Sequence, residues 1–436
     1  MARMASLLRT LTMNRVISLS RHRKSRTQPP YRENIFADLD FSSAYQPILS
    51  PTHQKLVGFE ALVRVTRDQM PISPAELFSR ASSGEQTVEL DSFLLHRHLE
   101  QFSGHSMPVW LFLNINPETC IHPASSLDRL VDHCRSCGIA PDRVVLELVE
   151  TASENPDALL KFIHMAKAKG FRIAIDDFGV GDSNFERLWR MDPMIVKLDR
   201  SLLVNAEQHH RARLLLESLV RMIRESGSLV LLEGIESEVQ AKIALATEAD
   251  LLQGFLLGRP GEVCPAIVEQ RETGLKSVMN HSRESTLQES SDHDDFLRLL
   301  RFEILETCHR LARGEAFTSA CEPMLRISGI KRCFLLDREG VQQGNLAFGT
   351  RHFAPQEFNP LYHSAGACWA HREYFRNAVT RPQHINASRP YVALPDAIRT
   401  VTLSTSLTSD NNRQVFCVDL HPDELFGGQL CFPQTL

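Results

Sequence analysis

The sequence predicts an α/β protein in two parts: a (β/α) barrel and, after it, a smaller α+β domain. The chain has 436 residues, which is too long for one ordinary domain and accommodates a barrel of about 250 residues with a second domain. From Phe41 to about Pro260, short β-like runs alternate with amphipathic helical stretches, a pattern typical of parallel strands joined by helices. After Arg313 this regular alternation stops.

Seven runs of the first part are expected to be strands. They are Val57–Val65, Val109–Ile115, Arg143–Leu148, Arg172–Asp176, Met194–Leu198, Leu229–Leu232 and Asp250–Leu256. The run at Arg172–Asp176 is short and apolar, with Gly170 before it and Gly179 after it, which is typical of a fully buried strand that ends abruptly. Seven such runs with helices between them indicate a TIM-like (β/α)8 barrel.

The composition indicates a globular protein. Apolar residues make up 43% of the chain and charged residues 23%, and the net charge of −5 gives no reason to expect a nucleic-acid partner. Ten cysteines are too sparse for a disulfide scaffold, and no apolar run reaches the roughly 18 residues that a transmembrane helix needs. We therefore expect a cytoplasmic protein with no transmembrane segment.

Residues 1–34 are strongly basic and contain a single acid, Glu33. We expect this N-terminal segment to be disordered. The loose alternation of apolar and basic residues from Leu7 to Leu19 leaves open a second interpretation, in which the segment lies on a membrane surface and makes the protein membrane-peripheral.

Each of the seven runs carries a polar side chain at or near its end. These residues are Glu60, Asn114, Glu147, Asp176 with Asp177, Lys197, Glu233 and Gln253. In barrels of this kind the active site is built from the carboxyl ends of the strands and the loops that follow. An isolated Asp-Asp pair is more often a turn with a helix cap, but a polar group in seven successive strands is not accidental packing. Because buried, unpaired carboxylates are costly, the pattern predicts a metal-binding catalytic site.

The ligand types indicate which metal is expected. Carboxylate and amide oxygens favour Mg²⁺ or Mn²⁺ over zinc. The carboxylates outnumber the ligands that one hexacoordinate ion usually takes, so we expect two ions, which can clamp the attacking and leaving oxygens of a phosphoryl displacement. Lys197 would orient a water molecule or stabilise charge that develops on phosphate. The residues alone therefore predict a metal-dependent phosphoesterase.

The motifs at these positions resemble the EAL family of cyclic di-GMP phosphodiesterases. The tripeptide that names the family stands here as Glu60-Ala61-Leu62. The other matching segments are Tyr45-Gln46-Pro47-Ile48, Leu113-Asn114-Ile115-Asn116, Glu147-Leu148-Val149-Glu150, Asp176-Asp177-Phe178-Gly179-Val180-Gly181, Lys197-Leu198-Asp199, Glu233-Gly234-Ile235-Glu236, Gln253-Gly254-Phe255 and Gly258-Arg259-Pro260. All of them occur in order, which makes the signal specific.

The resemblance implies a barrel whose first strand is antiparallel, hydrolysis of cyclic di-GMP to linear pGpG, and a homodimer. It assigns the metal ligands as Glu60, Asn114, Glu147, Asp176, Asp177 and Glu233. It assigns Lys197 and Gln253 to placing the catalytic water, with Glu60 and Glu233 also counted as catalytic, and Glu150 to anchoring the loop after Asp177. The expected substrate contacts are Arg64, which suits a phosphate, and Gln46, Asp199 and Glu236.

We place the barrel at residues 35–265 and a linker with a connecting helix at 266–313. The polar clusters in 261–295 predict a connecting helix with a linker, and the apolar periodicity of Phe296–Arg313 predicts a helix between subunits or domains. The last part, 314–436, contains β-like runs at Cys333–Asp337, Val401–Thr408 and Gln414–Leu420.

Residues 314–436 loosely resemble a PAS/Cache-like sensor domain. The resemblance rests on Trp369-x-x-Arg372-x-Tyr374-Phe375, on Arg389-Pro390-Tyr391 and on a strand pair that ends at Asp419. It implies that an unknown small ligand or protein binds there, with Arg372, Tyr374, Tyr391 and Asp419 as candidate contacts. The alternative is that the aromatic residues form core and that Arg372 pairs with an acid.

Three functions remain open from the sequence. The leading one is a cyclic di-GMP phosphodiesterase regulated by its C-terminal domain in bacterial second-messenger signalling. The second is a catalytically weak or inactive cyclic di-GMP receptor that signals through a protein partner. The third is an interaction scaffold that has lost nucleotide binding. The complete set of metal ligands with Lys197 favours the enzyme, and Arg64 disfavours the scaffold.

Overall fold

The computed structural model describes residues 36, 38–105, 107–122, 127–149, 155–180, 185–343, 347–348, 364–393, 398–409, 412–426, 432–433 and 435–436. The chain divides into two compact units, Met1–Lys276 (unit 1) and Ser277–Leu436 (unit 2). The basic segment 1–34 and Glu150, both named in the sequence predictions, lie outside the described residues.

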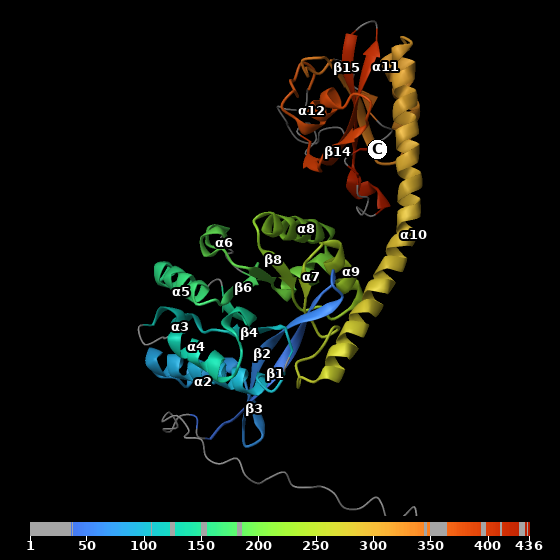
Figure 1. The fold of residues 1–436 in the computed structure, drawn as a ribbon. Coiled ribbons are helices and arrows are strands. Elements are labelled where there is room, and N and C mark those ends of the chain that lie inside the picture. Colours follow the sequence, from blue (N-terminus) through green and yellow to red (C-terminus); the bar gives the residue numbers. More distant parts are fainter. Residues whose placement is uncertain are drawn as a thin grey trace, which may run out of the picture. The chain divides into compact units, whose positions relative to one another are not determined.

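Eight strands of unit 1 form a closed barrel (Figure 1). Their order around the ring is β1, β9, β8, β7, β6, β5, β4 and β2, and the pairing of β1 with β2 closes it. The bounds are β1 Asp40–Ser50, β2 Lys55–Arg67, β4 Trp110–Asn114, β5 Val144–Val149, β6 Arg172–Phe178, β7 Ile195–Leu198, β8 Leu229–Leu232 and β9 Leu251–Leu252. Both pairings of β1 are antiparallel, while β2, β4 and the strands that follow pair in parallel. The predicted barrel, with its antiparallel first strand, is confirmed.

The barrel interior is filled by apolar side chains from most of its strands. One packed cluster takes one residue from each of seven strands: Ile48, Phe112, Val145, Ala174, Ile195, Leu231 and Leu251. The remaining strand, β2, has Gly58 at this level, where a Cβ atom would lie 2.7 Å from the Phe112 ring. The parallel strands are apolar along most of their length because both of their faces are buried.

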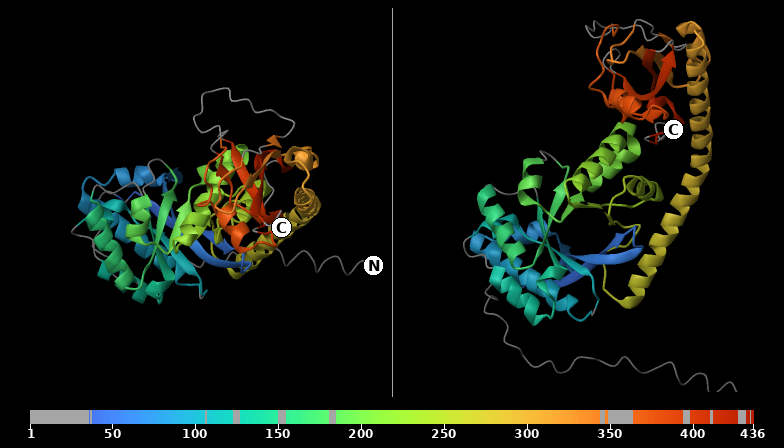
Figure 2. Two further views of the ribbon diagram at one scale, coloured as in Figure 1. Left: turned by 90° about the horizontal axis from the view of Figure 1, so that it is seen from above. Right: turned by 45° about the horizontal axis from the view of Figure 1, so that its top comes forward.

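Helices flank the barrel strands on the outside (Figure 2). Their bounds are α1 Pro74–Ser79, α2 Gly84–Phe102, α3 Pro117–Ile121, α4 Leu127–Ser136, α5 Pro156–Ala168, α6 Phe185–Met191, α7 Arg200–Gln208, α8 His210–Glu225 and α9 Glu238–Ala246. Several begin at a side chain that caps the first turn: Ser83 accepts from the Gln86 amide, Asn155 from Ala158 and Ser237 from Gln240. A short hairpin strand, β3 (Met70–Ile72), pairs with β2 outside the ring.

A single 48-residue helix, α10 (Pro265–Ala312), begins in unit 1 and ends in unit 2. It includes the polar clusters where we expected a connecting helix with a linker. These clusters are rich in Glu, Gln, Ser and Asp, and the first two are good helix formers, so polarity alone does not end a helix. Among the helices that the structure describes, none is both long and apolar enough to cross a membrane.

Unit 2 is built on an antiparallel sheet in the order β11, β10, β15, β14 and β12, with β13 also paired to β14. The strands are β10 Ile330–Leu336, β11 Ala347–Phe348, β12 Asn386–Ala387, β13 Tyr391–Val392, β14 Arg399–Ser409 and β15 Asn412–Leu420; the helices are α11 Phe317–Leu325 and α12 Glu373–Thr380. One face of the sheet packs on α10 and α11 through residues such as Ile304 and Phe416. The other packs on α12 through Phe334 and Tyr374. The predicted smaller α+β domain is confirmed.

Gly254 provides a stability test, because it lets the end of β9 approach the loop after β8. A Cβ atom there would lie 2.2 Å from the backbone nitrogen and oxygen of Ile235. We expect Gly254→Ala to destabilise unit 1 by about 1–3 kcal/mol. Gly274→Ala in α10 is the control, because nothing lies within 4 Å of its added methyl group and alanine favours a helix. Calorimetric melting of both variants would contradict the account if Gly254→Ala melted at or above the wild-type temperature.

Candidate functional site

The candidate site is organised around the ammonium group of Lys197, near the carboxyl end of β7. Its Nζ lies 2.7 Å from Glu233 Oε1, 2.8 Å from Glu147 Oε1, 3.0 Å from Asp176 Oδ1 and 3.8 Å from Glu60 Oε1. The Lys197 side chain is 1% exposed. Four carboxylates predicted from separate strand ends therefore converge on one buried cation.

Two amides complete the arrangement. Asn114 Nδ2 donates to Glu60 Oε1 at 3.0 Å, and Gln253 Nε2 donates to Glu60 Oε2 at 2.6 Å. These residues meet because parallel strands end at the same edge: Asn114, the last residue of β4, pairs in register with Glu147 of β5. The buried Oε1 of Gln253 has no hydrogen-bond partner within the described part of the chain.

The electrostatics of the cluster follow from burial and from its excess of negative charge. Burial favours the neutral amine of Lys197, but the surrounding carboxylates hold its pKa well above the ordinary value. Burial raises the pKa of Glu147 well above its usual range and raises that of Glu233 to about 7, in both cases against the attraction of Lys197. Burial also opposes ionisation of Glu60, yet Lys197 and the two amides keep its pKa below the ordinary value.

Asp177 is placed differently from Asp176. The β6–β7 pairing is irregular between Ile175 and Phe178, and Asp177 has a positive φ of 55°. Asp176 stays buried, while Asp177 is exposed, and its backbone amide donates to Asp176 Oδ1 at 3.0 Å. Burial and the neighbouring Asp176 raise the pKa of Asp177. Because of this bulge, the Asp177 side chain is exposed to solvent, while Asp176 remains in the buried cluster.

The predicted substrate contacts are distributed around this cluster. Gln46 pairs in register with Glu60 and donates to the Gly258 carbonyl at 3.3 Å. Arg64 is exposed on β2, with its Nη1 donating to the Val63 carbonyl.

Asp199 and Glu236 lie on the connections after β7 and β8. Asp199 caps α7 by accepting from the Ser201 amide at 2.8 Å. Glu236 forms a bidentate ion pair with Arg200, with both oxygens 2.7 Å from a guanidinium nitrogen. The structure therefore shows both carboxylates already engaged by neighbouring groups of the chain.

Arg200 was not among the predicted residues. Its side chain covers Gly234, where a Cβ atom would lie 2.3 Å from Arg200 Cγ, and Leu202 covers Gly179 in the same way at 2.5 Å. Both glycines have a positive φ. The first turn of α7 thus supports the loops after β6 and β8. The signal in the sequence is an arginine directly after the motif Lys197-Leu198-Asp199.

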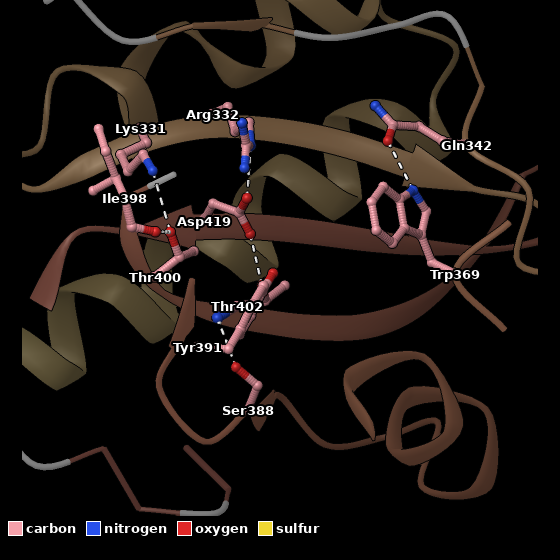
Figure 3. Close-up of polar contacts among 10 residues, drawn as sticks. All are labelled: Lys331, Arg332, Gln342, Trp369, Ser388, Tyr391, Ile398, Thr400, Thr402 and Asp419. Carbon is pink, nitrogen blue, oxygen red and sulfur yellow. Dashed lines mark hydrogen bonds and ion pairs between the residues drawn. The ribbon is translucent and has the colours of Figure 1, made fainter. Parts of the chain in front are cut away.

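Two of the residues proposed as ligand contacts in unit 2, Tyr391 and Asp419, belong to a polar network (Figure 3). Asp419 accepts from Arg332 Nε at 2.6 Å and from the Thr402 hydroxyl at 2.7 Å, and Tyr391 Oη lies 2.7 Å from the same hydroxyl. Tyr374 is a buried member of the apolar cluster under α12. The network is internally paired, which is the arrangement that a stable core requires of buried charge.

Arg372 lies against aromatic rings. Its guanidinium carbon is 5.4 Å from the centre of the Tyr391 ring and 5.9 Å from that of Trp369. Trp369 in turn donates to Gln342 at 3.0 Å. Arg372, Tyr391 and Asp419 therefore lie in one region of unit 2. Their role in binding a ligand stays a prediction.

The central role of Lys197 leads to a stability prediction for the metal-free protein. Replacing it in Lys197→Met leaves four carboxylates, three of them buried, without their cation, which we expect to cost about 3 kcal/mol of the free energy of unfolding of unit 1. Lys276→Met, at an exposed position, is the control. The measurement is denaturant unfolding in excess chelator. Equal stability of Lys197→Met and wild type would show that the carboxylates do not depend on this ammonium group.

Comparison with known proteins agrees with this geometry. Residues 31–260 match the family described as EAL domain. The uncharacterised EAL-domain protein YkuI of Bacillus subtilis is 26% identical over 370 residues, covering 78% of this chain and 84% of YkuI. The cyclic di-GMP phosphodiesterase NbdA of Pseudomonas aeruginosa is 28% identical over 224 residues, which are 50% of this chain and 28% of NbdA. The chain spans only 28–32% of the length of NbdA and of two other curated relatives.

A solved structure shares the fold. The crystal structure of B. subtilis YkuI, in complex with substrate c-di-GMP and calcium, superposes with a TM-score of 0.70 at 22% identity, covering 89% of this chain and 97% of YkuI. The family match extends over more than half of the chain and includes every strand of the barrel. The chain therefore belongs to the EAL domain family.

Proposed function

We propose that unit 1 hydrolyses one phosphodiester bond of cyclic di-GMP to give linear pGpG, and that it requires divalent cations. The observation that carries the proposal is the convergence of Glu60, Glu147, Asp176 and Glu233 on Lys197 at the active end of the barrel. The names of two relatives support the substrate: NbdA is a cyclic di-GMP phosphodiesterase, and YkuI was solved with c-di-GMP as substrate.

The chemistry of the site fits divalent cations. Four carboxylates lie within 3.8 Å of one ammonium group and Asp177 adds a fifth negative charge nearby, so the cluster carries excess negative charge unless protons or cations bind. The buried Gln253 Oε1 is an oxygen without a hydrogen-bond partner among the described residues. No three acidic, histidine or cysteine side chains among them are already arranged around a metal position, so binding would require side chains to shift.

The residues that would hold Mg²⁺ or Mn²⁺ are Glu60, Asn114, Glu147, Asp176, Asp177 and Glu233, and their number favours two ions. When bound, the ions supply an activated water and stabilise charge on the phosphate oxygens. Lys197 keeps the carboxylates together without the ions, and three of them occupy its ammonium hydrogens. Once these carboxylates turned to the ions, the ammonium group would be free to hold a water or to stabilise a developing negative charge. Gln253, bonded to Glu60, would orient the same water.

Substrate binding is proposed for the residues around this centre. Arg64 is exposed, and its planar guanidinium suits a phosphate of the nucleotide. Gln46 lies beside Glu60 on the neighbouring strand. Asp199 and Glu236, on adjacent loops, would contact the substrate, Glu236 while held by Arg200. Glu150 would anchor the loop after Asp177.

Unit 2 is proposed as a regulatory domain that responds to a small ligand or a protein, in a homodimeric protein. Arg372, Tyr374, Tyr391 and Asp419 are the candidate contacts. Regulation of this kind needs two states that the ligand stabilises differently, typically by about 1–3 kcal/mol. The buried Nε of Arg372 supports the proposal, because it has no hydrogen-bond partner among the described residues and could donate to a ligand.

The test is incubation with cyclic di-GMP and Mg²⁺ or Mn²⁺, followed by separation of the products. We expect pGpG to form, chelator to abolish the reaction, and Ca²⁺ to inhibit it because its looser coordination misplaces the water. Glu60→Ala should lower turnover by at least about a hundredfold. Glu225→Ala, at an exposed position on α8, should leave turnover unchanged.

Two outcomes would reject this function. Turnover that persists in excess chelator would exclude the role of cations. Saturable binding of cyclic di-GMP without any product would show that the protein is not an active phosphodiesterase. It would favour the alternative function, a receptor that signals through a protein partner.

A further inference from the structure

The inference concerns the outer face of α10, where this helix belongs to unit 2. The inner face of this segment packs on the sheet and α11 through Leu300, Ile304 and Leu311. On the opposite face, Leu299, Phe302 and Leu305 are exposed, at 45%, 62% and 43%. Single exposed apolar residues are common on proteins, but three on one face of a helix form a patch.

The charged residues beside this patch are arranged symmetrically about Phe302. Arg298 lies four residues before Phe302 and Glu306 four residues after it. Asp295 and His309, both exposed, lie seven residues before and after it. Each member of a pair therefore lies at the same distance from Phe302 along the helix axis, about 6 Å for the first pair.

We propose that this face binds the same face of a second copy of the chain, with the two helices antiparallel and a twofold axis at Phe302. A twofold axis brings each residue opposite the one at the mirrored position. It would place Phe302 against the Phe302 of the second copy, and Leu299 against Leu305. It would also place Arg298 against Glu306 and Asp295 against His309. The pairs named here then join apolar with apolar side chains, arginine with glutamate, and an aspartate with an imidazole that can donate a hydrogen bond to it.

The parallel arrangement is disfavoured by the same residues. In a parallel pair each residue near the contact line meets its own copy. Arg298 would then face Arg298, Glu306 would face Glu306 and Asp295 would face Asp295, with each pair repelling. The charges therefore select both the partner, a second copy, and the direction of the helices.

The two α10 helices can lie side by side over a long enough segment to form a stable contact. With the twofold axis at Phe302, Ala312 of one copy lies opposite residue 292 of the other. Ala312 is the last residue of α10, so about 30 Å of each helix takes part in the contact. The charged residues now form pairs within the helix, Arg298 with Asp295 at 3.2 Å and Arg310 with Glu306 at 3.7 Å. These pairs are exposed to solvent and contribute little, so they can be shared with a second helix at small cost.

The test is a charge exchange in the full-length chain, with the dimer Kd measured by sedimentation over a range of protein concentrations. Arg298→Glu and Glu306→Arg, each alone, put like charges at two symmetric contacts and should raise the Kd roughly tenfold. The double variant restores opposite charges and should return the Kd to near the wild-type value. Arg326→Glu, which breaks an exposed pair with Glu322 on α11, is the control and should have no effect.

A crosslinking experiment tests the direction of the helices independently. Leu299→Cys and Leu305→Cys are prepared separately, mixed and oxidised, with wild type as the background for native cysteines such as the exposed Cys368. We expect a disulfide-linked dimer in the mixture above the level of either variant alone. Equally strong crosslinking of Leu299→Cys with itself would contradict the antiparallel pairing. A wild-type chain that remains monomeric, or a dimer unaffected by the charge variants, would overturn the proposal.

Discussion

The ion cluster at Lys197 is the interaction on which the functional end of the barrel depends. Burying an ammonium group and several carboxylates costs free energy that is recovered only when they meet at hydrogen-bonding distance. Here three carboxylates lie within 3.0 Å of Nζ and a fourth within 3.8 Å. Because each comes from a different strand, the cluster requires the strands to keep their register. The barrel in turn supplies the rigid frame that such a cluster needs.

The loops around the cluster are fixed by packing as well as by charge. Gly179 and Gly234 adopt positive φ and lie under Leu202 and Arg200, so the first turn of α7 fixes the loops on both sides of β7. Arg200 also holds Glu236 in a bidentate pair. The loop after β6, which follows Asp176 and Asp177, and the loop after β8, which carries Glu236, are thus joined to the helix that follows Lys197, and a shift of this helix would move them together.

Much of the barrel and most of the cluster could be predicted from the sequence. Polar residues at the ends of apolar runs identify strand ends, and parallel strands bring their ends together, so Glu147 and Lys197 could be placed without coordinates. The antiparallel first strand came only from the family resemblance, because the direction of a strand leaves no mark in its apolar pattern. The bulge that exposes Asp177 depends on the positive φ of that one residue. The residue types around Asp177 do not predict this backbone conformation.

Other features depend on long-range packing that local patterns do not report. α10 continues without a break through the segment where a helix and a linker were expected, because its polar residues are compatible with a helix and apolar residues near both of its ends are buried, such as Leu275 and Ile304. In unit 2, a pattern of aromatic and charged residues could mean core or ligand site. The structure shows Tyr374 in an apolar cluster and Asp419 in a paired network, a distinction that depends on which strands become neighbours.

The central claim is that the carboxylates around Lys197 form a site for divalent cations. Calorimetric titration of the nucleotide-free protein with Mn²⁺, comparing wild type with Asp176→Asn, tests it directly. This substitution keeps the size of the side chain and removes one of the charges beside Lys197. The account predicts saturable binding to wild type and at least about tenfold weaker binding to the variant. Equal binding by both proteins, or no binding to wild type, would contradict it.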